Sequence, residues 1–244
     1  MNEYFDIENK LIDNIFTDAE IHRIYQNNEL IPDDYKRRVE EVGYHASHDP
    51  LNDELTEKIK NILENVSGKS LEKYMVHFAR YTKDENSSPM LMPHFDVGLE
   101  YATVSISIVL ESTLDWDIAV EGKTFKVSKN QGVTFSGSHQ WHWRPNIEFS
   151  DNDYYDILVC QYKEKGNLNP ITEEHKDIMR KRTVELVENW QFENPSGPYS
   201  DKQWLLDNYV NGDMDISDIC TEYNQPTSVI LRFLDLYGIT VKQP

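Results

Sequence analysis

The feature that most constrains the fold is a block of alternating apolar and polar residues between positions 71 and 165. Within it, six β-rich runs are separated by Lys, Asp, Asn, Gly or Pro residues: YMVHFARY, YATVSISIVLES, DWDIAVEG, KTFKVS, GVTFSG and YDILVCQYK. A period of two places alternate side chains on opposite faces of a strand, so one face can be buried. Short strands at this close spacing predict an all-β sandwich or barrel.

Helical patterns precede and follow the β-rich block. Residues 18–26 have the pattern of a capped helix, and residues 54–66 carry apolar side chains at helical spacing. We expect both helices to support the β domain. Residues 172–190 predict a further helix, with an apolar face formed by Ile178, Val184, Leu186, Val187 and Trp190. The predicted fold class is therefore mainly β with flanking helices, that is, α+β.

A change of composition separates this domain from the C-terminal part of the chain. Residues 191–200, QFENPSGPYS, hold two prolines, one glycine and two serines and predict a linker. Beyond it the sequence predicts three short helices, WLLDNYVNG, ISDICTEYN and TSVILRFLDLYG, with a tight turn at residues 224–226. We therefore predict one domain at residues 1–190, a linker at 191–200 and a small helical module at 201–244.

Charge, hydropathy and cysteine content argue against several classes of protein. The 244 residues have a net charge of −19, with 43 acidic and 24 basic side chains, which opposes unspecific binding to nucleic acids or anionic membranes. No apolar run approaches the roughly 18 residues of a membrane span. The N-terminus, MNEYFDIENK, has neither a basic region nor an apolar signal core, so a cytoplasmic location is expected. Cys160 and Cys220 are the only cysteines, which argues against a disulfide framework or a zinc ribbon.

The strongest chemical signal is the segment Pro93-His94-Phe95-Asp96. Its two polar side chains are separated by one residue, so on a strand they point to the same face and can bind one metal ion. A single His-x-Asp step is common by chance, and its alternative reading is a surface pair or a hydrogen-bonded core histidine. A metal site needs a third ligand.

Two histidines further along the chain can supply this ligand. The segment GVTFSGSHQWHWRP contains His139 and His142. Two imidazoles and one carboxylate leave three positions open on the metal, which is the facial arrangement of non-haem iron(II) oxygenases. Iron is therefore the expected metal. Zinc can use the same ligands, but the HExxH helix of a zinc protease is not found nearby.

The order of these segments resembles the 2-oxoglutarate- and iron(II)-dependent oxygenases. PHFD is followed by YATVSISIVLES, then by DWDIAVEGKTFKV, and then by GVTFSGSHQWHWRP. The resemblance covers roughly residues 70–165 and is closest to the branch related to prolyl hydroxylases, including microbial and viral members. It implies a double-stranded β-helix, or jelly roll, in which His94, Asp96 and His142 are the catalytic metal ligands at one mouth. In this reading His139 lies in the turn before the strand that carries His142.

The same resemblance implies a basic residue for the far carboxylate of 2-oxoglutarate. Arg144 is the leading candidate, because a residue two positions after His142 shares its face of the strand. Many family members place this basic residue further along the chain, where residues 151–156 are acidic or neutral here. Arg80 and Tyr81 are the alternatives. They are adjacent on a strand and point to opposite faces, so at most one can enter the cavity, and a structural ion pair is the competing reading for Arg80.

The resemblance implies an oxidoreductase, a dioxygenase that acts as a hydroxylase with Fe(II), O2 and 2-oxoglutarate as co-substrate, and with ascorbate as a reductant. Hydroxylation of a protein side chain or a small molecule would be coupled to the decarboxylation of 2-oxoglutarate to succinate. Two alternatives stay open: the same chemistry on a nucleic acid base, and a non-catalytic, cupin-like binding protein. Substrate identity is not encoded in a readable way, because specificity in this fold resides in loops.

The C-terminal segment MDISDICTEYNQPTSVILRFLDLYGI resembles helix-turn-helix modules, whose second helix enters a DNA major groove. Residues 201–244 contain seven acidic and three basic side chains, whereas a phosphate-binding face is rich in Lys and Arg. Only Arg232 lies on the predicted recognition helix, residues 227–237. We therefore favour protein docking or dimerisation for this module, with DNA contact as the alternative.

Overall fold

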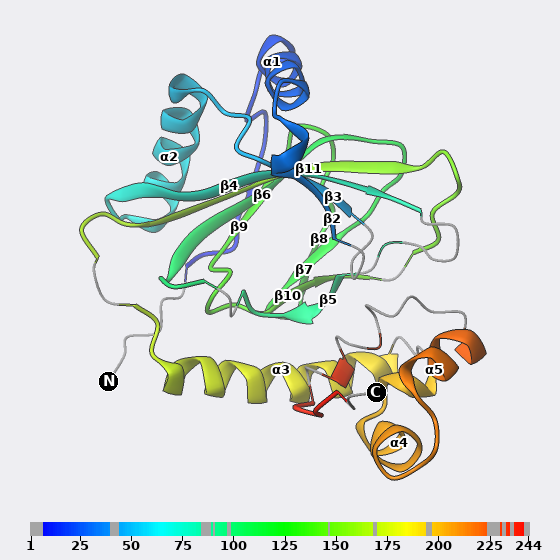
Figure 1. Cartoon of the computed structure of the whole chain (residues 1–244). Helices are drawn as coiled ribbons and strands as arrows, with labels where there is room; N and C mark the ends of the chain where they lie inside the picture. Colours follow the sequence, from blue (N-terminus) through cyan, green and yellow to red (C-terminus); the bar gives the residue numbers. More distant parts are fainter. Residues whose placement is uncertain are drawn as a thin grey trace.

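The structure is a computed structural model (Figure 1). It describes residues 7–39, 44–83, 89, 91–96, 99–145, 147–167, 170–193, 197–223, 230, 233–234 and 237–241. None of the helices formed by these residues is long and apolar enough to cross a membrane.

Two antiparallel sheets form the core of the protein, as predicted for a mainly β chain. The larger sheet has the strand order β1-β9-β6-β11-β4-β3-β2. Its strands are β1 (Leu11–Ile12), β2 (Lys36–Val39), β3 (Tyr44–His48), β4 (Leu71–Thr82), β6 (Thr103–Ser112), β9 (Gly132–Phe135) and β11 (Tyr154–Glu164). The smaller sheet has the order β5-β10-β7-β8 and contains β5 (Leu91–His94), β7 (Ile118–Val120), β8 (Lys123–Phe125) and β10 (His142–Arg144). The larger and smaller sheets are the two layers of a jelly roll.

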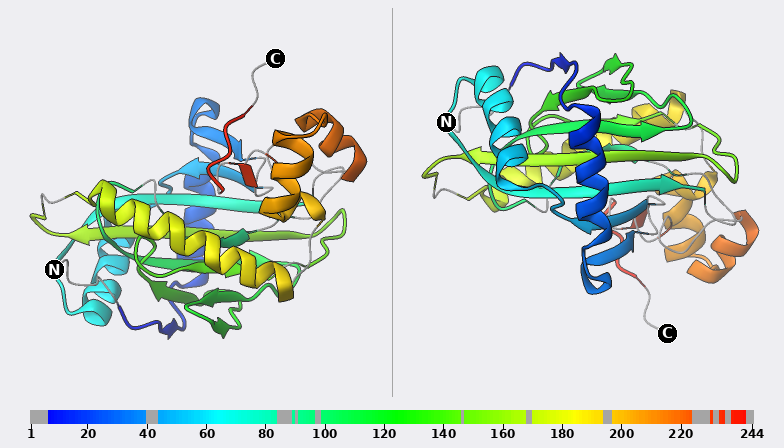
Figure 2. Two further views of the ribbon diagram at one scale, coloured as in Figure 1. Left: turned by 90° about the horizontal axis from the view of Figure 1, so that it is seen from below. Right: turned by 90° about the horizontal axis from the view of Figure 1, so that it is seen from above.

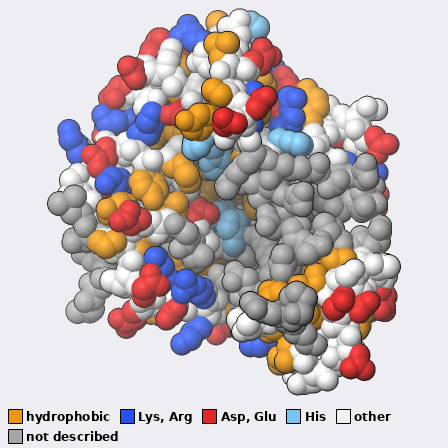
Figure 3. All heavy atoms as spheres, in the orientation of Figure 1, with side chains coloured by type: hydrophobic (Ala, Val, Ile, Leu, Met, Phe, Trp, Pro, Cys, Tyr) orange, Lys and Arg blue, Asp and Glu red, His pale blue; other side chains and the backbone are white. Residues whose placement is uncertain are grey.

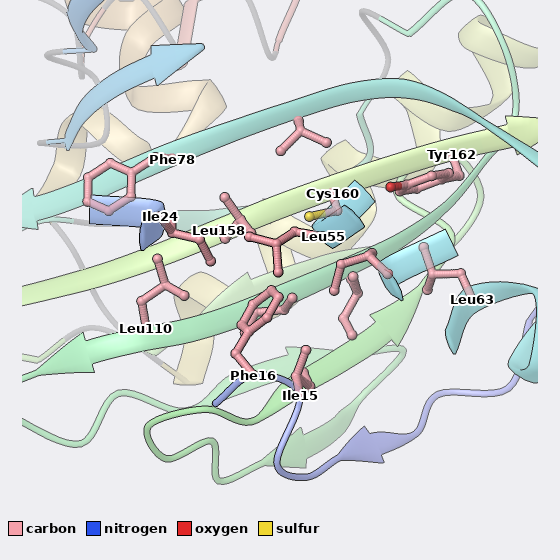
Figure 4. Packing of buried hydrophobic residues seen from close by; sticks show 14 of the residues in the cluster. Ile15, Phe16, Ile24, Leu55, Leu63, Phe78, Leu110, Leu158, Cys160 and Tyr162 are labelled. Carbon is pink, nitrogen blue, oxygen red and sulfur yellow. The ribbon is translucent and has the colours of Figure 1, made fainter. Parts of the chain in front are cut away.

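The central strand β11 shows how the alternating pattern divides the interior. It pairs with β4 on one side and with β6 on the other. Leu158, Cys160 and Tyr162 point to the outer face of the larger sheet, into a cluster of buried apolar residues that we call the outer core (Figure 4). Val159 and Gln161, in between, point to the inner face and line a cavity between the two sheets.

Two N-terminal helices, α1 (Asp18–Glu29) and α2 (Asp53–Ser67), cover the outer face of the larger sheet (Figure 1). Helix α1 begins with a capping box between Thr17 and Glu20. Helix α2 begins at the N-cap Asn52 and ends at Gly68, which has the positive φ of 68° that a glycine adopts without strain. Both predicted helices are confirmed, and each extends slightly beyond its predicted bounds.

The N-terminal region also contains strands where helices and polar connectors were expected. Strands β2 and β3 pair with each other, and β3 extends the larger sheet along β4. The short strand β1 pairs with β9 at the opposite edge. These strands escaped prediction because they lie at or near a sheet edge and have little apolar alternation of their own.

Helix α3 (Glu173–Glu193) lies along the outer face of the smaller sheet (Figures 1 and 2). The helix was predicted, but its buried face was partly wrong: Ile178 is 54% exposed, and Met179 and Thr183 are buried instead. Val184 packs as predicted. The side chains of residues 186–190 lie outside the described part of the chain.

The C-terminal module begins within the predicted linker. Its elements are η3 (Pro198–Ser200), α4 (Lys202–Leu205), η4 (Leu206–Val210) and α5 (Ile216–Tyr223). Residues 194–196 of the linker, the turn at 224–226, Arg232 and most of the predicted recognition helix lie outside the described residues. Of that helix, Ile230, Phe233, Leu234 and Tyr237 are described, and all four are buried. The division into two domains therefore stays a prediction.

Candidate metal centre

His94, Asp96 and His142 meet at one mouth of the jelly roll. His94 ends β5 and His142 begins β10, and the two residues are direct partners in the antiparallel pairing of these strands. One Asp96 carboxylate oxygen lies 3.6 Å from His94 Nε2 and 3.8 Å from His142 Nε2. One ligand atom from each residue lies within 4.8 Å of the other two. The structure thus brings together the three residues that the sequence predicted as ligands.

Backbone carbonyls fix which nitrogen of each imidazole faces the centre. His94 Nδ1 lies 2.7 Å from the Met92 carbonyl oxygen, and His142 Nδ1 lies 3.1 Å from that of Gln140. A carbonyl oxygen only accepts, so each Nδ1 carries the proton and donates it. The lone pair of each neutral ring is then on Nε2, the atom that points to Asp96. This is the arrangement that orients histidine ligands of metals in proteins.

Asp96 is placed differently from what its spacing suggested. Strand β5 ends at His94, so Asp96 does not share a strand with it. Instead, Asp96 N donates to the Gly137 carbonyl oxygen at 2.8 Å. Its second carboxylate oxygen accepts from Gln161 Nε2 on β11 at 2.9 Å. The carboxylate is therefore held from two sides, with its first oxygen directed toward the histidines.

Gly137 and Gln161 are functional candidates that the sequence did not reveal. A Cβ atom at position 137 would lie 2.1 Å from the second carboxylate oxygen of Asp96, so only glycine fits there. Gln161 is 2% exposed, and its Oε1 has no hydrogen-bond partner among the described residues. A small residue after strand β9 and a lone glutamine on β11 carry no distinctive motif, so only the fold identifies them.

The pKa shifts of Asp96 and His142 favour the protonation states that a metal requires of its ligands. Burial raises the pKa of Asp96, but His142 and His94 outweigh it and lower that pKa to about 2. Burial, helped by the neighbouring His94, lowers the pKa of His142 to about 4. At neutral pH Asp96 is thus a carboxylate and His142 a neutral imidazole, which are the protonation states of metal ligands.

His139 does not take part in this group. It lies before β10, as expected, and is buried, with Nδ1 2.9 Å from Ser138 Oγ. Its ring packs against that of His175 of α3, with centroids 4.4 Å apart and planes inclined by 36°. Burial lowers its pKa to about 4. The geometry thus favours His142 over His139 as the third ligand.

A cavity of about 650 Å³ extends from the candidate ligands between the two sheets. Arg144 lines it and is 1% exposed. Its Nη1 donates to the Trp116 carbonyl oxygen at 2.5 Å and to Tyr155 Oη at 3.2 Å. Its Nε is buried without a partner among the described residues, and none of their carboxylates forms a salt bridge with it. Arg144 is thus a buried cation facing the same cavity as His142.

Tyr81 and Arg80 point to opposite faces of β4, as adjacent strand residues should. Tyr81 is buried, lines the cavity and packs edge-on against Trp116, with ring centroids 5.0 Å apart. Arg80 lies on the other face and binds both carboxylate oxygens of Asp156, at 2.7 and 2.6 Å. Arg80 is therefore not available to the cavity, and the competing reading, a structural ion pair, describes it.

The open end of the cavity is lined by aromatic, histidine and methionine side chains: Tyr35, His48, Tyr74, Met75 and His77. Tyr35 and Met75 are 57% and 39% exposed, and the Tyr35 ring packs on the His48 ring at 5.5 Å. On this face of the molecule, histidine side chains reach the surface next to hydrophobic ones (Figure 3). Among the described lining residues, Asp96 and Arg144 are the only Asp, Glu, Lys or Arg side chains.

No protein-family model and no curated protein matches the sequence. Solved structures do match. The non-haem α-ketoglutarate-dependent epimerase SnoN of nogalamycin biosynthesis, in complex with Fe3+, α-ketoglutarate and nogalamycin RO, gives a TM-score of 0.53 at 9% identity, over 66% of this chain and 80% of that one. HygX of Streptomyces hygroscopicus, with nickel, 2-oxoglutarate and hygromycin B bound, gives 0.51 at 11% identity, over 66% and 84%. A prolyl-4-hydroxylase of Pseudomonas putida gives 0.47 at 12% identity, over 66% and 94%.

The first two matches show what the shared architecture is. At identities this low, a structural likeness shows a common fold and not a common activity. The chain has the jelly-roll fold of the 2-oxoglutarate-dependent non-haem iron enzymes. The predicted fold is thereby confirmed, and the three candidate ligands converge within it.

Proposed function

We propose that the protein is an iron(II)- and 2-oxoglutarate-dependent oxygenase that hydroxylates a protein side chain or a small molecule. The observation that carries the proposal is the convergence of His94, Asp96 and His142 in a jelly roll, with the buried cation Arg144 in the same cavity. The shared fold alone would not support an activity, because folds host many functions.

The donor set fits iron(II). Two neutral imidazoles and one carboxylate are the ligands of the facial triad, which leaves three positions of an octahedral ion open. His94 and His142 would bind through Nε2, because their Nδ1 protons are donated to backbone carbonyls. Asp96 would bind through the oxygen that faces them, because Gln161 occupies the other one. The surrounding hydrogen bonds thus prepare all three side chains for ligation.

Arg144 fits the far carboxylate of 2-oxoglutarate. A cation that is 1% exposed and lacks an acidic partner among the described residues weakens the folded state unless an anion joins it. A dicarboxylate with one end at the metal supplies that anion from within the cavity. We propose that Arg144 donates to this carboxylate and that Tyr81, which lines the same cavity, contacts it too. Arg80 has no part in this site.

When bound, iron and 2-oxoglutarate supply the oxidising chemistry: 2-oxoglutarate and O2 yield succinate and CO2 as a C–H bond of the substrate becomes C–OH. The residues of this chain bind and orient. Arg144 fixes the co-substrate, and the apolar side chains of Ile118, Phe135 and Val159 exclude water beside it. The open end, with Tyr35 and Met75 at its rim, would admit the substrate.

Neither alternative function gains a specific observation. A nucleic acid base as substrate rests on the helix-turn-helix resemblance, and the acidic excess of residues 201–244 opposes it. A cupin-like protein that binds no anion in the cavity would give no reason for the buried Arg144 there. That reading predicts that 2-oxoglutarate is not consumed under any condition.

The test is succinate production from 2-oxoglutarate by anaerobically purified protein given ferrous iron, ascorbate and oxygen, beside the His142→Ala variant. We expect slow, substrate-independent succinate formation by the wild type and none by the variant. The matched control is His139→Ala, which removes a buried histidine outside the ligand group and should keep the activity. Equal turnover in wild type and His142→Ala would contradict the proposal.

A further inference from the structure

The two strands that carry the candidate histidine ligands are also part of the C-terminal module's hydrophobic core. Met92 on β5 is 2% exposed and belongs to one buried cluster with Leu205, Tyr209 and Phe233, which we call the C-terminal core. Trp143 on β10 packs against the same cluster. The views from two directions place α4 and α5 beside this sheet and the end of α3 (Figures 1 and 2). The module is therefore docked directly behind the metal centre.

Cavity residues and module contacts share both strands. On β10, His142 lines the cavity and the adjacent Trp143 packs on the module side; on β5, Leu91 and His94 line the cavity, whereas Met92 packs into the C-terminal core. Phe95, between His94 and Asp96, is buried on that side too, under the guanidinium of Arg182 of α3 at 5.7 Å. The smaller sheet is thus a single layer with metal ligands on its inner face and module contacts on its outer face.

Strand β5 depends on this support more than an interior strand would. Among the strands formed by the described residues, it is the edge strand of the smaller sheet and pairs with β10 alone, with a register shift between His142 and Arg144. Its third residue is Pro93, which has no N–H to donate to a neighbouring strand. Within the described part of the chain, β10 is therefore the one strand partner of β5, whose Met92 carbonyl oxygen lies 2.7 Å from His94 Nδ1 and orients that ring.

We propose that the C-terminal module is a positioning element for the metal centre. Packing of Met92 and Trp143 against the C-terminal core holds β5 and β10 at the separation at which His94 and His142 meet Asp96. This inference rests on the proposed function for the identity of the metal site. It assigns the module a role in metal binding, in place of DNA reading or dimerisation.

The first test measures Co(II) affinity by visible absorption in the full-length protein without 2-oxoglutarate. We expect Met92→Ala to weaken Co(II) binding on the order of 10-fold, the lower end of the effect of losing an outer-shell partner. Met92→Leu should restore most of it, because leucine refills the contact. Leu205→Ala, inside the module and 0% exposed, should act in the same direction. The control is Leu63→Ala in the outer core, which is equally buried but lies behind the other sheet.

The second test needs no variant. Coupling between two sites is reciprocal, so if the module tightens the metal site, metal must stabilise the module. We expect Co(II) to slow amide hydrogen exchange in α4 and α5 of the wild type and to leave α2 unchanged. Unchanged exchange in α4 and α5, or equal Co(II) affinity in Met92→Ala and wild type, would overturn the role of the module alone. Absence of Co(II) binding by the wild type would instead contradict the proposed function.

Discussion

The two faces of the larger sheet are buried to a similar degree but are built from different side chains. On the outer face, Leu55 and Leu63 of α2 pack on the strands and are 0% exposed, in a cluster of apolar residues. The inner face instead borders the cavity, where Gln161 of this sheet and Arg144 of the smaller sheet opposite are 2% and 1% exposed, yet each keeps a polar atom without a partner among the described residues. Both Arg144 and Gln161 face the cavity.

This difference separates the residues that stabilise the fold from those that would bind the proposed metal and co-substrate. Burial of each leucine or isoleucine side chain on the outer face contributes roughly 1.5–3 kcal/mol to folding. A buried polar atom without a hydrogen-bond partner instead lowers the stability of the folded protein. The inner face therefore lowers the stability of the ligand-free protein, and a bound metal and dicarboxylate would recover that loss. Substitutions on the two faces should accordingly affect different measurements.

The largest effect is expected from Gly137→Ala, beside the inner face. The added methyl group would lie 2.1 Å from the second carboxylate oxygen of Asp96, so the carboxylate must leave the position at which it meets the histidines. We expect Co(II) affinity to fall on the order of 100-fold or more, since losing an outer-shell partner alone costs about 10–100-fold. Titration followed by visible absorption measures it.

Gly132→Ala is the matched control for this substitution. Its methyl group would lie 3.0 Å from side-chain carbons of Ile106 and Ile108, away from the candidate ligands. It should lower stability and leave Co(II) affinity intact. Wild-type affinity in Gly137→Ala would show that Asp96 is not a ligand in the observed position.

The outer face should respond in stability alone. Leu63→Ala removes a fully buried side chain, and we expect the free energy of unfolding to fall by about 3 kcal/mol, within the usual range for such a cavity. Urea unfolding followed by circular dichroism measures this loss. The Co(II) affinity of the folded protein should not change. A parallel loss of metal affinity would mean that the two faces are not independent.

The sequence predicted the outer core better than the inner face. Periodicity placed α2 and the long strands, because a face buried against apolar neighbours leaves a repeating pattern of its own. The candidate ligands His94, Asp96 and His142 were predicted from ligand chemistry and from the resemblance in segment order, and the structure brings them together. Gly137 and Gln161 were missed because their roles depend on which segments meet in space.

Arg144 and Arg80 illustrate the same limit. Both are single arginines on predicted strands, and alternation indicates only that Arg80 and Tyr81 face opposite ways. Which of them faces inward depends on the sheet pairing. Asp156, the partner of Arg80, lies directly across from it on β11, a pairing that spans most of the chain's central region. The sequence contains Arg80 and Asp156 but does not reveal that they are neighbours in the sheet.

Low pH should lower the stability of the protein through His142, which faces the cavity, and should not affect the apolar outer face. In the metal-free protein, burial lowers the pKa of His142 from 6.5 to about 4. Between these values the unfolded chain binds a proton that the folded protein does not, so stability is full above pH 6.5 and falls as the pH drops toward 4. The shift corresponds to about 3 kcal/mol. Asp96, with a pKa lowered to about 2, stays ionised in this window.

The test compares unfolding free energies at pH 7 and pH 4.5 with metal removed by a chelator. His142→Leu should flatten the pH dependence, although His139, whose pKa is also lowered to about 4, keeps part of it. Leu63→Ala should lower stability equally at both pH values. An unchanged slope in His142→Leu would show that this imidazole titrates normally in the folded protein.

The smallest effect, and the sharpest contrast between the faces, comes from replacing each arginine by methionine. Arg144→Met removes the inner cation, which has no acidic partner among the described residues, so 2-oxoglutarate affinity should fall about 30-fold, or roughly 2 kcal/mol. The stability of the ligand-free protein should stay level or rise, because an apolar side chain of similar size replaces a buried charge.

Arg80→Met should lower the stability of the protein and leave its affinity for 2-oxoglutarate unchanged. Asp156 is 0% exposed and, among the described side chains, would keep only the Tyr25 hydroxyl at 2.7 Å. We therefore expect stability to fall by about 2 kcal/mol and 2-oxoglutarate affinity to stay unchanged. Isothermal titration with 2-oxoglutarate and urea unfolding separate the two outcomes. If both variants lost 2-oxoglutarate affinity and stability together, the inner and outer faces would act as one cooperative unit. Ligand binding and stability could then not be assigned to different faces.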